Sequence, residues 1–181
     1  GVCFVTRGPG ATNAASGIHI AHQDSTPLIM FVGQIGRHMV GRDAFQEVDY
    51  RKTFSDLAKW VEQIDQADRI PEVISHAFHV AMSGRPGPVV IALPEDMLKD
   101  LSAATVAPRV EVASPAPEPN AIKQLLEMVN NSSKPLVIAG GSRWDAKAVD
   151  DLHKWAEQWQ LPVAVSFRRQ QLFHHTHANY A

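Results

Sequence analysis

Short apolar runs alternate with amphipathic stretches along the first half of the chain. Three runs, "GVCFVT" (1–6), "PLIMFVGQ" (27–34) and "PVVIALP" (88–94), are apolar at successive positions, which is typical of strands buried on both faces. We expect a helix over 11–22 and a further short strand over 59–64. Buried strands that alternate with helices predict a parallel sheet covered on both sides.

The clearest helical pattern in this half covers residues 68–83. Asp68 can cap the helix, Pro71 suits its first turn, and Gly84 ends it. A weaker helical pattern covers 43–57. The apolar positions that share one face of the 68–83 helix are Ile70, Val73, Ile74, Ala77 and Ala81.

A second α/β pattern follows "APRVEVASPAPEP" (107–119), whose four prolines and lack of periodicity indicate a linker. Strands are expected over 135–141 and 162–167. Apolar helix faces are formed by Ile122, Leu125, Leu126 and Val129, and by Val149, Leu152, Ala156 and Trp159. The predicted fold class is α/β, with two incomplete three-layer units of mainly parallel sheet joined by the proline-rich linker. We interpret the chain as an internal piece of a longer protein.

Composition narrows the classes of partner. The 181 residues carry a formal net charge of −2, which gives no electrostatic basis for binding nucleic acid or an anionic membrane. No apolar run approaches the roughly 20 residues that a membrane-spanning helix needs. Cys3 is the single cysteine, which favours a reducing compartment, so we expect a cytoplasmic protein.

The segment "FVTRGPGATNAA" (4–15) passes from a strand through Gly8-Pro9-Gly10 into a helix. Glycines allow a ligand to approach the backbone, and a helix start offers unpaired N–H groups. The segment lacks the Gly-Lys-Ser/Thr ending of a phosphate loop and the third glycine of the dinucleotide fingerprint. The residues alone leave two alternatives open, a plain strand-to-helix turn and a ligand-binding turn.

Five motifs, in this order, resemble the thiamine diphosphate enzymes of the acetohydroxyacid synthase and pyruvate oxidase group. The motifs are "GPGATNAASGIHIAHQDSTPLIMFVGQ", "GRDAFQEVD", "SGRPGPVVIALPEDM", "KPLVIAGGS" and "LPVAVSFRRQ". The resemblance implies that residues 1–97 are the later part of the pyrimidine-binding domain. It further implies that 98–118 are a linker and that 119–181 open the middle domain of a three-domain subunit.

The resemblance also implies roles for individual residues. Pro9 and Asn13 match positions that line the cofactor, and Phe45 and Gln46 match positions near its reactive carbon and the substrate. The family's activating glutamate is expected before Gly1, and the Gly-Asp-Gly…Asn motif that holds Mg²⁺ is expected outside the chain. We therefore expect no catalytic residue and no metal ligand here, and a chain that is inactive alone.

Three more residues match nucleotide-side positions of the family. Arg85 matches an arginine that approaches FAD in flavin-containing relatives, with a surface arginine as the alternative. Gly140 and Gly141 match a turn of the middle domain that holds FAD or ADP, or stays empty. Glu95 departs from the pattern, because acetohydroxyacid synthases usually carry lysine there. This counts against true acetohydroxyacid synthase activity and is compatible with another branch, a decarboxylase, a carboligase or an acyl-transferring relative.

The resemblance implies a lyase or transferase that uses thiamine diphosphate and Mg²⁺. Such an enzyme decarboxylates a 2-oxo acid or joins two carbon units in the manner of acetolactate synthase. We expect a homo-oligomer, a dimer or tetramer, with an apolar surface around Pro9, Asn13 and Phe45. The alternative hypothesis is a non-catalytic module for adenine-nucleotide binding or assembly.

Other polar and aromatic clusters have structural interpretations. Asp43, Glu47 and Asp49 are interpreted as acids that cap and solvate a helix start. The histidines lack a completing set of carboxylates or cysteines, so no metal site is predicted. Three tryptophans are expected in the core of the second unit: Trp144, Trp155 and Trp159.

Overall fold

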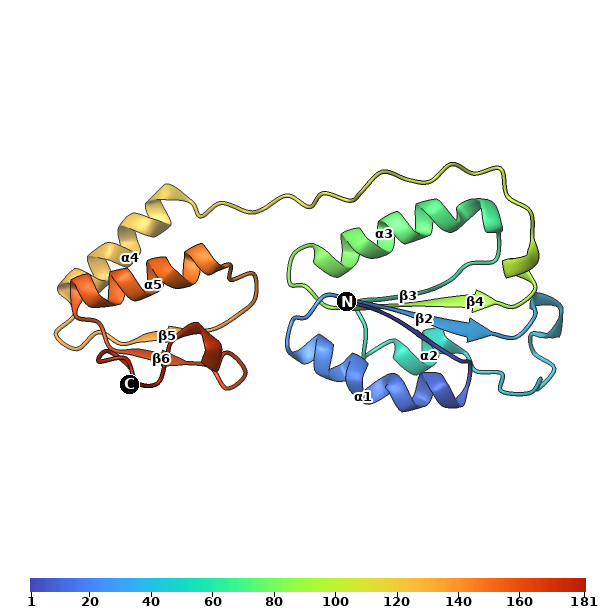
Figure 1. Ribbon diagram of the computed structural model, residues 1–181, viewed down its shortest axis with the longest axis horizontal. Coiled ribbons are helices and arrows are strands. Elements are labelled where there is room, and N and C mark those ends of the chain that lie inside the picture. The colour runs from blue at the N-terminus through green and yellow to red at the C-terminus, as the bar shows by residue number, and fades with distance from the viewer. The chain divides into compact units, whose positions relative to one another are not determined.

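The computed structural model describes all residues, 1–181, and divides into two compact units, Gly1–Ala113 and Ser114–Ala181. Four parallel strands of the first unit form one sheet in the order β1-β2-β4-β3 (Figure 1). The predicted α/β class with a parallel sheet is therefore confirmed. In chain order the helices and strands of this unit are β1 (Val2–Val5), α1 (Pro9–Gln23), β2 (Leu28–Gln34), α2 (Tyr50–Phe54), β3 (Trp60–Gln63), α3 (Ile70–Met82) and β4 (Pro88–Pro94).

Helices cover both faces of this sheet, with α3 on one face and α1 and α2 on the other (Figure 1). In the register of the central strands, Phe31 of β2 lies between Phe4 of β1 and Ile91 of β4. The strands are apolar at successive positions because alternate side chains enter different cores. Ile29 and Phe31 face α3, and Met30 faces α1 and α2.

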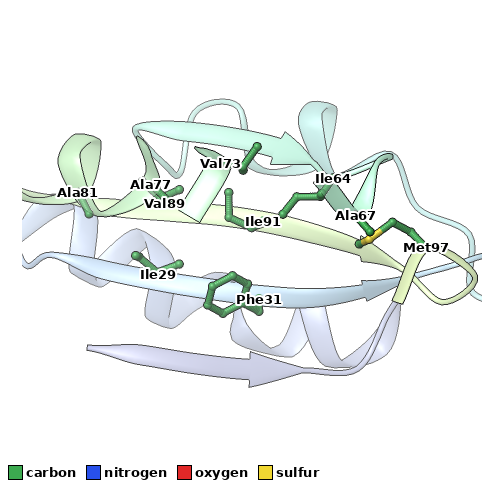
Figure 2. Close-up of a cluster of buried hydrophobic side chains, with 10 residues drawn as sticks. All are labelled: Ile29, Phe31, Ile64, Ala67, Val73, Ala77, Ala81, Val89, Ile91 and Met97. Atoms are coloured by element: carbon green, nitrogen blue, oxygen red, sulfur yellow. The ribbon is translucent and has the colours of Figure 1, made fainter. Parts of the chain in front are cut away.

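The core beneath α3 joins the helix to β2, to β4 and to the segments that follow β3 and β4 (Figure 2). The side chains of Val73, Ala77 and Ala81 lie on the buried face of α3, as the pattern predicts. Ile70 and Ile74 of the same predicted face are only partly buried and pack at the margin of this core. The periodicity therefore located the face, while the position of the helix on the sheet decided how deeply each residue is buried.

Two local predictions in this unit are wrong. The helical pattern over 43–57 yields only the short helix α2, because residues before Tyr50 form a loop with left-handed backbone at Asp43 and Gln46. Asp49, by contrast, does cap α2, and its carboxylate accepts a hydrogen bond from the Lys52 N–H at 3.2 Å. Asp68 does not cap α3. Its carboxylate instead accepts hydrogen bonds from the Ser102 hydroxyl and the Ala103 N–H.

Residues 101–118 form neither helix nor strand. The second unit contains a small sheet in which β5 and β6 are parallel, and residues 179–181 pair with Val163 of β6. None of the helices combines the length and the apolar character that a membrane-spanning helix requires. The helices and strands of this unit are α4 (Pro119–Asn131), β5 (Val137–Ala139), α5 (Ala146–Trp159) and β6 (Val163–Val165).

The two helices of the second unit differ in burial. Leu152 and Ala156 of α5 are buried against the small sheet, with Trp144 and Trp155 partly buried beside them. Helix α4 forms where the pattern predicts it, but no residue of α4 is buried. Leu125, for example, is 48% exposed. The expected apolar face of α4 is thus present and uncovered.

Candidate functional site

The Gly8-Pro9-Gly10 turn lies at the carboxyl edge of the parallel sheet, where open α/β sheets bind ligands. Gly8 has φ +53, a conformation that side chains disfavour, and α1 begins directly after it at Pro9. The Gly8 carbonyl accepts a hydrogen bond from the Thr12 N–H at 3.0 Å and from its hydroxyl at 3.2 Å. These bonds close the first turn of α1 and fix the backbone at the edge.

Tyr50 ties this turn to the sheet. Its hydroxyl accepts a hydrogen bond from the Gly8 N–H at 2.8 Å and donates one to the Gly33 carbonyl at 3.2 Å. The side chain is buried, and burial raises the pKa of the hydroxyl, so it stays protonated and able to donate. One side chain from the start of α2 therefore holds the turn against the end of β2.

Residues 40–49 form a loop that meets the turn from the other side. A Cβ atom on Gly8 would lie 2.9 Å from Cβ of Gln46 and 3.2 Å from the Gln46 carbonyl oxygen. Only glycine leaves room for this contact, so Gln46 packs directly on the turn. Phe45 precedes it and is 78% exposed. The structure thus brings Phe45 and Gln46 to the edge that carries Pro9.

Pro9 and Asn13 lie four residues apart on α1 and therefore share one face of the helix. Both side chains are exposed. Together with Phe45 and Gln46 they form a surface on the carboxyl side of the sheet. Four of the residues singled out from the sequence are thereby gathered in one region, although they come from two separate segments.

Gln34, at the end of β2, was not predicted as a site residue. It is 6% exposed. Its side-chain NH₂ group donates a hydrogen bond to the Val48 carbonyl at 2.9 Å, and its side-chain oxygen accepts one from the Ile35 N–H at 2.9 Å. Gln34 thereby anchors the loop 40–49 to the sheet. A polar residue that ends an otherwise apolar run was the signal available in the sequence.

A charged pair lies across the same edge. The Arg7 guanidinium, next to the turn, donates to the Glu95 carboxylate at 2.7 Å. Glu95 follows β4, and its N–H donates to the Gln34 carbonyl at 3.1 Å. The negative charge at position 95 is therefore balanced within the chain. A cavity of about 340 Å³ lies nearby, lined in part by Gln34, Val40, Glu47, Tyr50 and Gln63.

Comparisons with known proteins match both units. Residues 1–53 match the family model described as the N-terminal TPP binding domain of thiamine pyrophosphate enzymes. Residues 122–181 match the model for the central domain of the same enzymes.

The chain belongs to the thiamine pyrophosphate enzymes. It is 38% identical over 168 residues to the acetolactate synthase large subunit of Lactococcus lactis, covering 90% of this chain and 29% of that protein. It is 33% identical over 183 residues to acetolactate synthase large subunit IlvB1 of Mycobacterium tuberculosis, covering 98% of this chain and 29% of that protein.

An X-ray structure from Mycobacterium smegmatis, assigned to the thiamin diphosphate-dependent enzymes, superposes with a TM-score of 0.89 at 26% identity. The superposition covers 99% of this chain and 35% of that one. The chain thus spans about a third or less of the length of these thiamine pyrophosphate enzymes.

The remaining candidate residues lie elsewhere in this family member. Arg85 precedes β4 at the amino edge of the sheet, away from Pro9 and Gln46. Its guanidinium donates to the Ser25 hydroxyl at 2.7 Å and to the carbonyls of His22 and Gln23. Arg85 therefore joins the end of α1 to the start of β4, and its role toward a nucleotide stays a prediction.

Gly140 and Gly141 lie in the second unit, after β5 and at the carboxyl edge of the small sheet. A Cβ atom on Gly140 would lie 2.9 Å from the Ser166 hydroxyl oxygen, and the Gly140 carbonyl accepts a bond from the Trp144 indole at 2.8 Å. Gly141 has φ +78 with open space around it. The backbone of this turn is fixed on one side and accessible on the other.

Proposed function

We propose that the carboxyl edge of the first unit supports the aminopyrimidine side of thiamine diphosphate in an acetolactate synthase-like enzyme. The observation that carries this proposal is the contact between Gly8 and Gln46, which joins the turn and the loop into one surface. Both segments lie within the residues that match the TPP-binding family model. Residues 1–97 are accordingly proposed as part of the pyrimidine domain and 119–181 as part of the middle domain.

The side chains at this edge suit an aromatic ring that carries an amino group. Pro9 offers an apolar surface, Asn13 offers an amide donor and acceptor, and Gly8 leaves the backbone accessible. Phe45 and Gln46 would then face the reacting end of the bound group. When bound, thiamine diphosphate supplies a nucleophilic carbon and an electron sink, and this chain's residues position and shield it.

The proposed substrates are 2-oxo acids of the pyruvate type, from the activity that names the relatives. Arg7 and Glu95 modify this expectation, because the pair is internally neutral where synthases usually present a lysine. We expect this charge pattern to alter the choice of acceptor rather than the use of the cofactor. The chain alone is proposed to be inactive, and acceptor choice, oligomeric assembly and cytoplasmic location remain proposals for the whole protein.

A chimera tests the proposed function. Residues 1–181 replace the matching segment of the Lactococcus lactis acetolactate synthase large subunit, and acetolactate formation is followed with thiamine diphosphate and Mg²⁺. We expect cofactor-dependent turnover of a 2-oxo acid, which Gln46→Ala lowers, and a gain in acetolactate formation with Glu95→Lys. A chimera that assembles and unfolds like the parent yet turns over no 2-oxo acid would contradict the proposal.

We propose the Gly140–Trp144 turn as the place where a nucleotide such as FAD or ADP would lie if the middle unit binds one. Its support is the open space at Gly141 and the position of the turn at a carboxyl sheet edge. Titration of the chain with FAD and ADP, followed by calorimetry, tests this. Saturable ADP binding without any response to thiamine diphosphate would favour a non-catalytic nucleotide-binding module instead.

A further inference from the structure

The loop 40–49 holds an unusual backbone conformation. Gly41, Asp43 and Gln46 have φ values of +78, +55 and +66. For residues other than glycine this left-handed region costs about 1–2 kcal/mol each, so the surroundings must stabilise it. The segment contains no helix or strand that could do so.

Glu47 provides this stabilisation from within the loop. Its two carboxylate oxygens accept hydrogen bonds from the Gly41 N–H at 2.6 Å and from the Ala44 N–H at 3.0 Å. Its own N–H donates to the Ala44 carbonyl at 2.9 Å. Hydrogen bonds to an ionised acceptor are roughly twice as strong as those between neutral groups. The carboxylate therefore acts as an internal anion around which the backbone folds.

The electrostatics of Glu47 agree with this geometry. The N–H groups of Gly41 and Ala44, followed by those of Arg42 and Asp43, lower the pKa of the Glu47 carboxyl. Two N–H groups, of Gly41 and Ala44, thus converge on one carboxylate, as in a backbone anion nest. The expected role of Glu47 as an acid that solvates a helix start is wrong, since α2 begins later, at Tyr50.

The wrapped conformation determines where the next two side chains lie. Phe45 is turned out to solvent at the tip, and the backbone of Gln46 rests on Gly8. On the far side, Gln34 holds the Val48 carbonyl, so the loop is fixed at its end as well as around Glu47.

We propose that Glu47 is a positioning residue whose carboxylate holds residues 41–47 in the conformation that presents Phe45 and Gln46 to the ligand at the Gly8-Pro9 turn. The presentation to a ligand rests on the proposed function, whereas the hold on the loop does not. The Glu47 carboxylate is bound to the Gly41 and Ala44 N–H groups and so acts through its neighbours.

The first test measures amide hydrogen exchange on the full chain by NMR. Glu47→Gln removes the charge and places an amide donor against N–H donors, so exchange at Gly41 and Ala44 should rise about tenfold or more. Glu72→Gln is the matched control, because Glu72 of α3 is an exposed carboxylate that pairs with Arg69, the residue before the helix. Unchanged exchange at Gly41 and Ala44 in Glu47→Gln would overturn the proposal.

A pH series separates the carboxylate from general loosening. Asp49, Arg51 and Glu62 line the same cavity as Glu47, so their titration must be distinguished from its own. In the wild type, protection of Gly41, corrected for intrinsic exchange, should fall as the pH drops through the lowered pKa of Glu47. In Glu47→Gln this step should vanish, and Glu47→Asp, which keeps the charge, should restore part of it. A step that persists in Glu47→Gln would assign it to another group and count against Glu47.

A titration with thiamine diphosphate, followed by NMR, tests the role of Glu47 separately from the proposed function. Thiamine diphosphate is added to the wild type and to Glu47→Gln, with protected amides of β2 and β4 as the check that each chain is folded. We expect shifts at Gly8 in both chains and at Gln46 in the wild type alone. No shift in either chain would count against the proposed function, and equal Gln46 shifts in both would overturn the positioning role.

Discussion

Both units alternate parallel strands with helices, but they bury very different fractions of their apolar side chains. In the first unit four parallel strands lie between helices on both faces, and Ile91 at the centre of β4 is fully buried. In the second unit the sheet has two strands, and Ile138 in β5 is 70% exposed. An apolar strand pattern is therefore informative about secondary structure, while burial depends on how many neighbouring elements are present.

Helices α3 and α4 differ in burial in the same way as the two sheets. Each has 13 residues, a proline in its first turn and an apolar face. Helix α3 places Val73, Ala77 and Ala81 in the core, whereas α4 buries no residue. Since most helical stability comes from packing of the apolar face, we expect α3 to be held firmly and α4 to fray.

The largest expected effect contrasts the two sheets. Ile91→Ala should destabilise the first unit by about 2–5 kcal/mol, because it leaves a cavity in a closed core. Ile138→Ala should change the stability of the second unit by less than about 0.5 kcal/mol, since the side chain is mostly solvated already. Urea unfolding followed by amide exchange in each unit measures both, and equal losses would refute the contrast.

The next prediction compares the two helices within the second unit. Leu152→Ala on α5 should cost about 2–4 kcal/mol, because Leu152 is only 8% exposed. Leu125→Ala on α4, 48% exposed, should cost under about 1 kcal/mol. If both substitutions lower the free energy of unfolding equally in a monodisperse sample, the apolar face of α4 is packed and the contrast with α5 is wrong.

The turns of the two units give a sharper comparison. Gly8→Ala combines a positive φ with a Cβ contact at 2.9 Å to Gln46, so it should cost about 2 kcal/mol or more and disturb the Gln46 resonances. Gly141→Ala has the positive φ but open space, so about 1 kcal/mol is expected. Thermal unfolding and NMR spectra of both variants measure this. Equal costs would mean that the Gln46 contact contributes nothing.

The smallest expected effect is a change in the stability of the first unit at acid pH. Hydrogen bonds from the Arg37 N–H and guanidinium lower the pKa of Asp96 to about 2 from an ordinary 3.8. The unfolded chain therefore takes up this proton first, so the stabilisation is complete above about pH 3.8 and is lost as the pH falls toward 2. Asp96→Asn should flatten the acid limb of the unfolding profile of the first unit.

Asp150 supplies the counterpart in the second unit. Lys154 lowers the pKa of this carboxyl as well, but both side chains are largely exposed and screened by solvent. Asp150→Asn should therefore change the acid profile less than Asp96→Asn does. The reverse order would contradict the assignment of the stronger pair to the first unit.

The sequence predicted the strands and long helices because their apolar periodicity is local information. It did not predict the loop 40–49, which is held by the Glu47 carboxylate and also by contacts to Gly8 and Gln34 that are distant in the chain. The resemblance identified Pro9, Asn13, Phe45 and Gln46, and the structure brings them to one edge. It did not reveal Tyr50 or Gln34 as anchors. The polar end of an apolar run marked Gln34, but the hydrogen-bond partners of both side chains lie far away in the chain and are known only from the structure.

The central claim is that the turn and the loop of the first unit form one ligand-facing edge. Its most direct test is an NMR titration of the full chain with thiamine diphosphate, with ADP as the comparison ligand. We predict weak, saturable shifts from thiamine diphosphate centred on Gly8, Asn13 and Gln46, and none there from ADP. Thiamine diphosphate shifts confined to Gly140 and Gly141, or no shifts at all, would contradict the account.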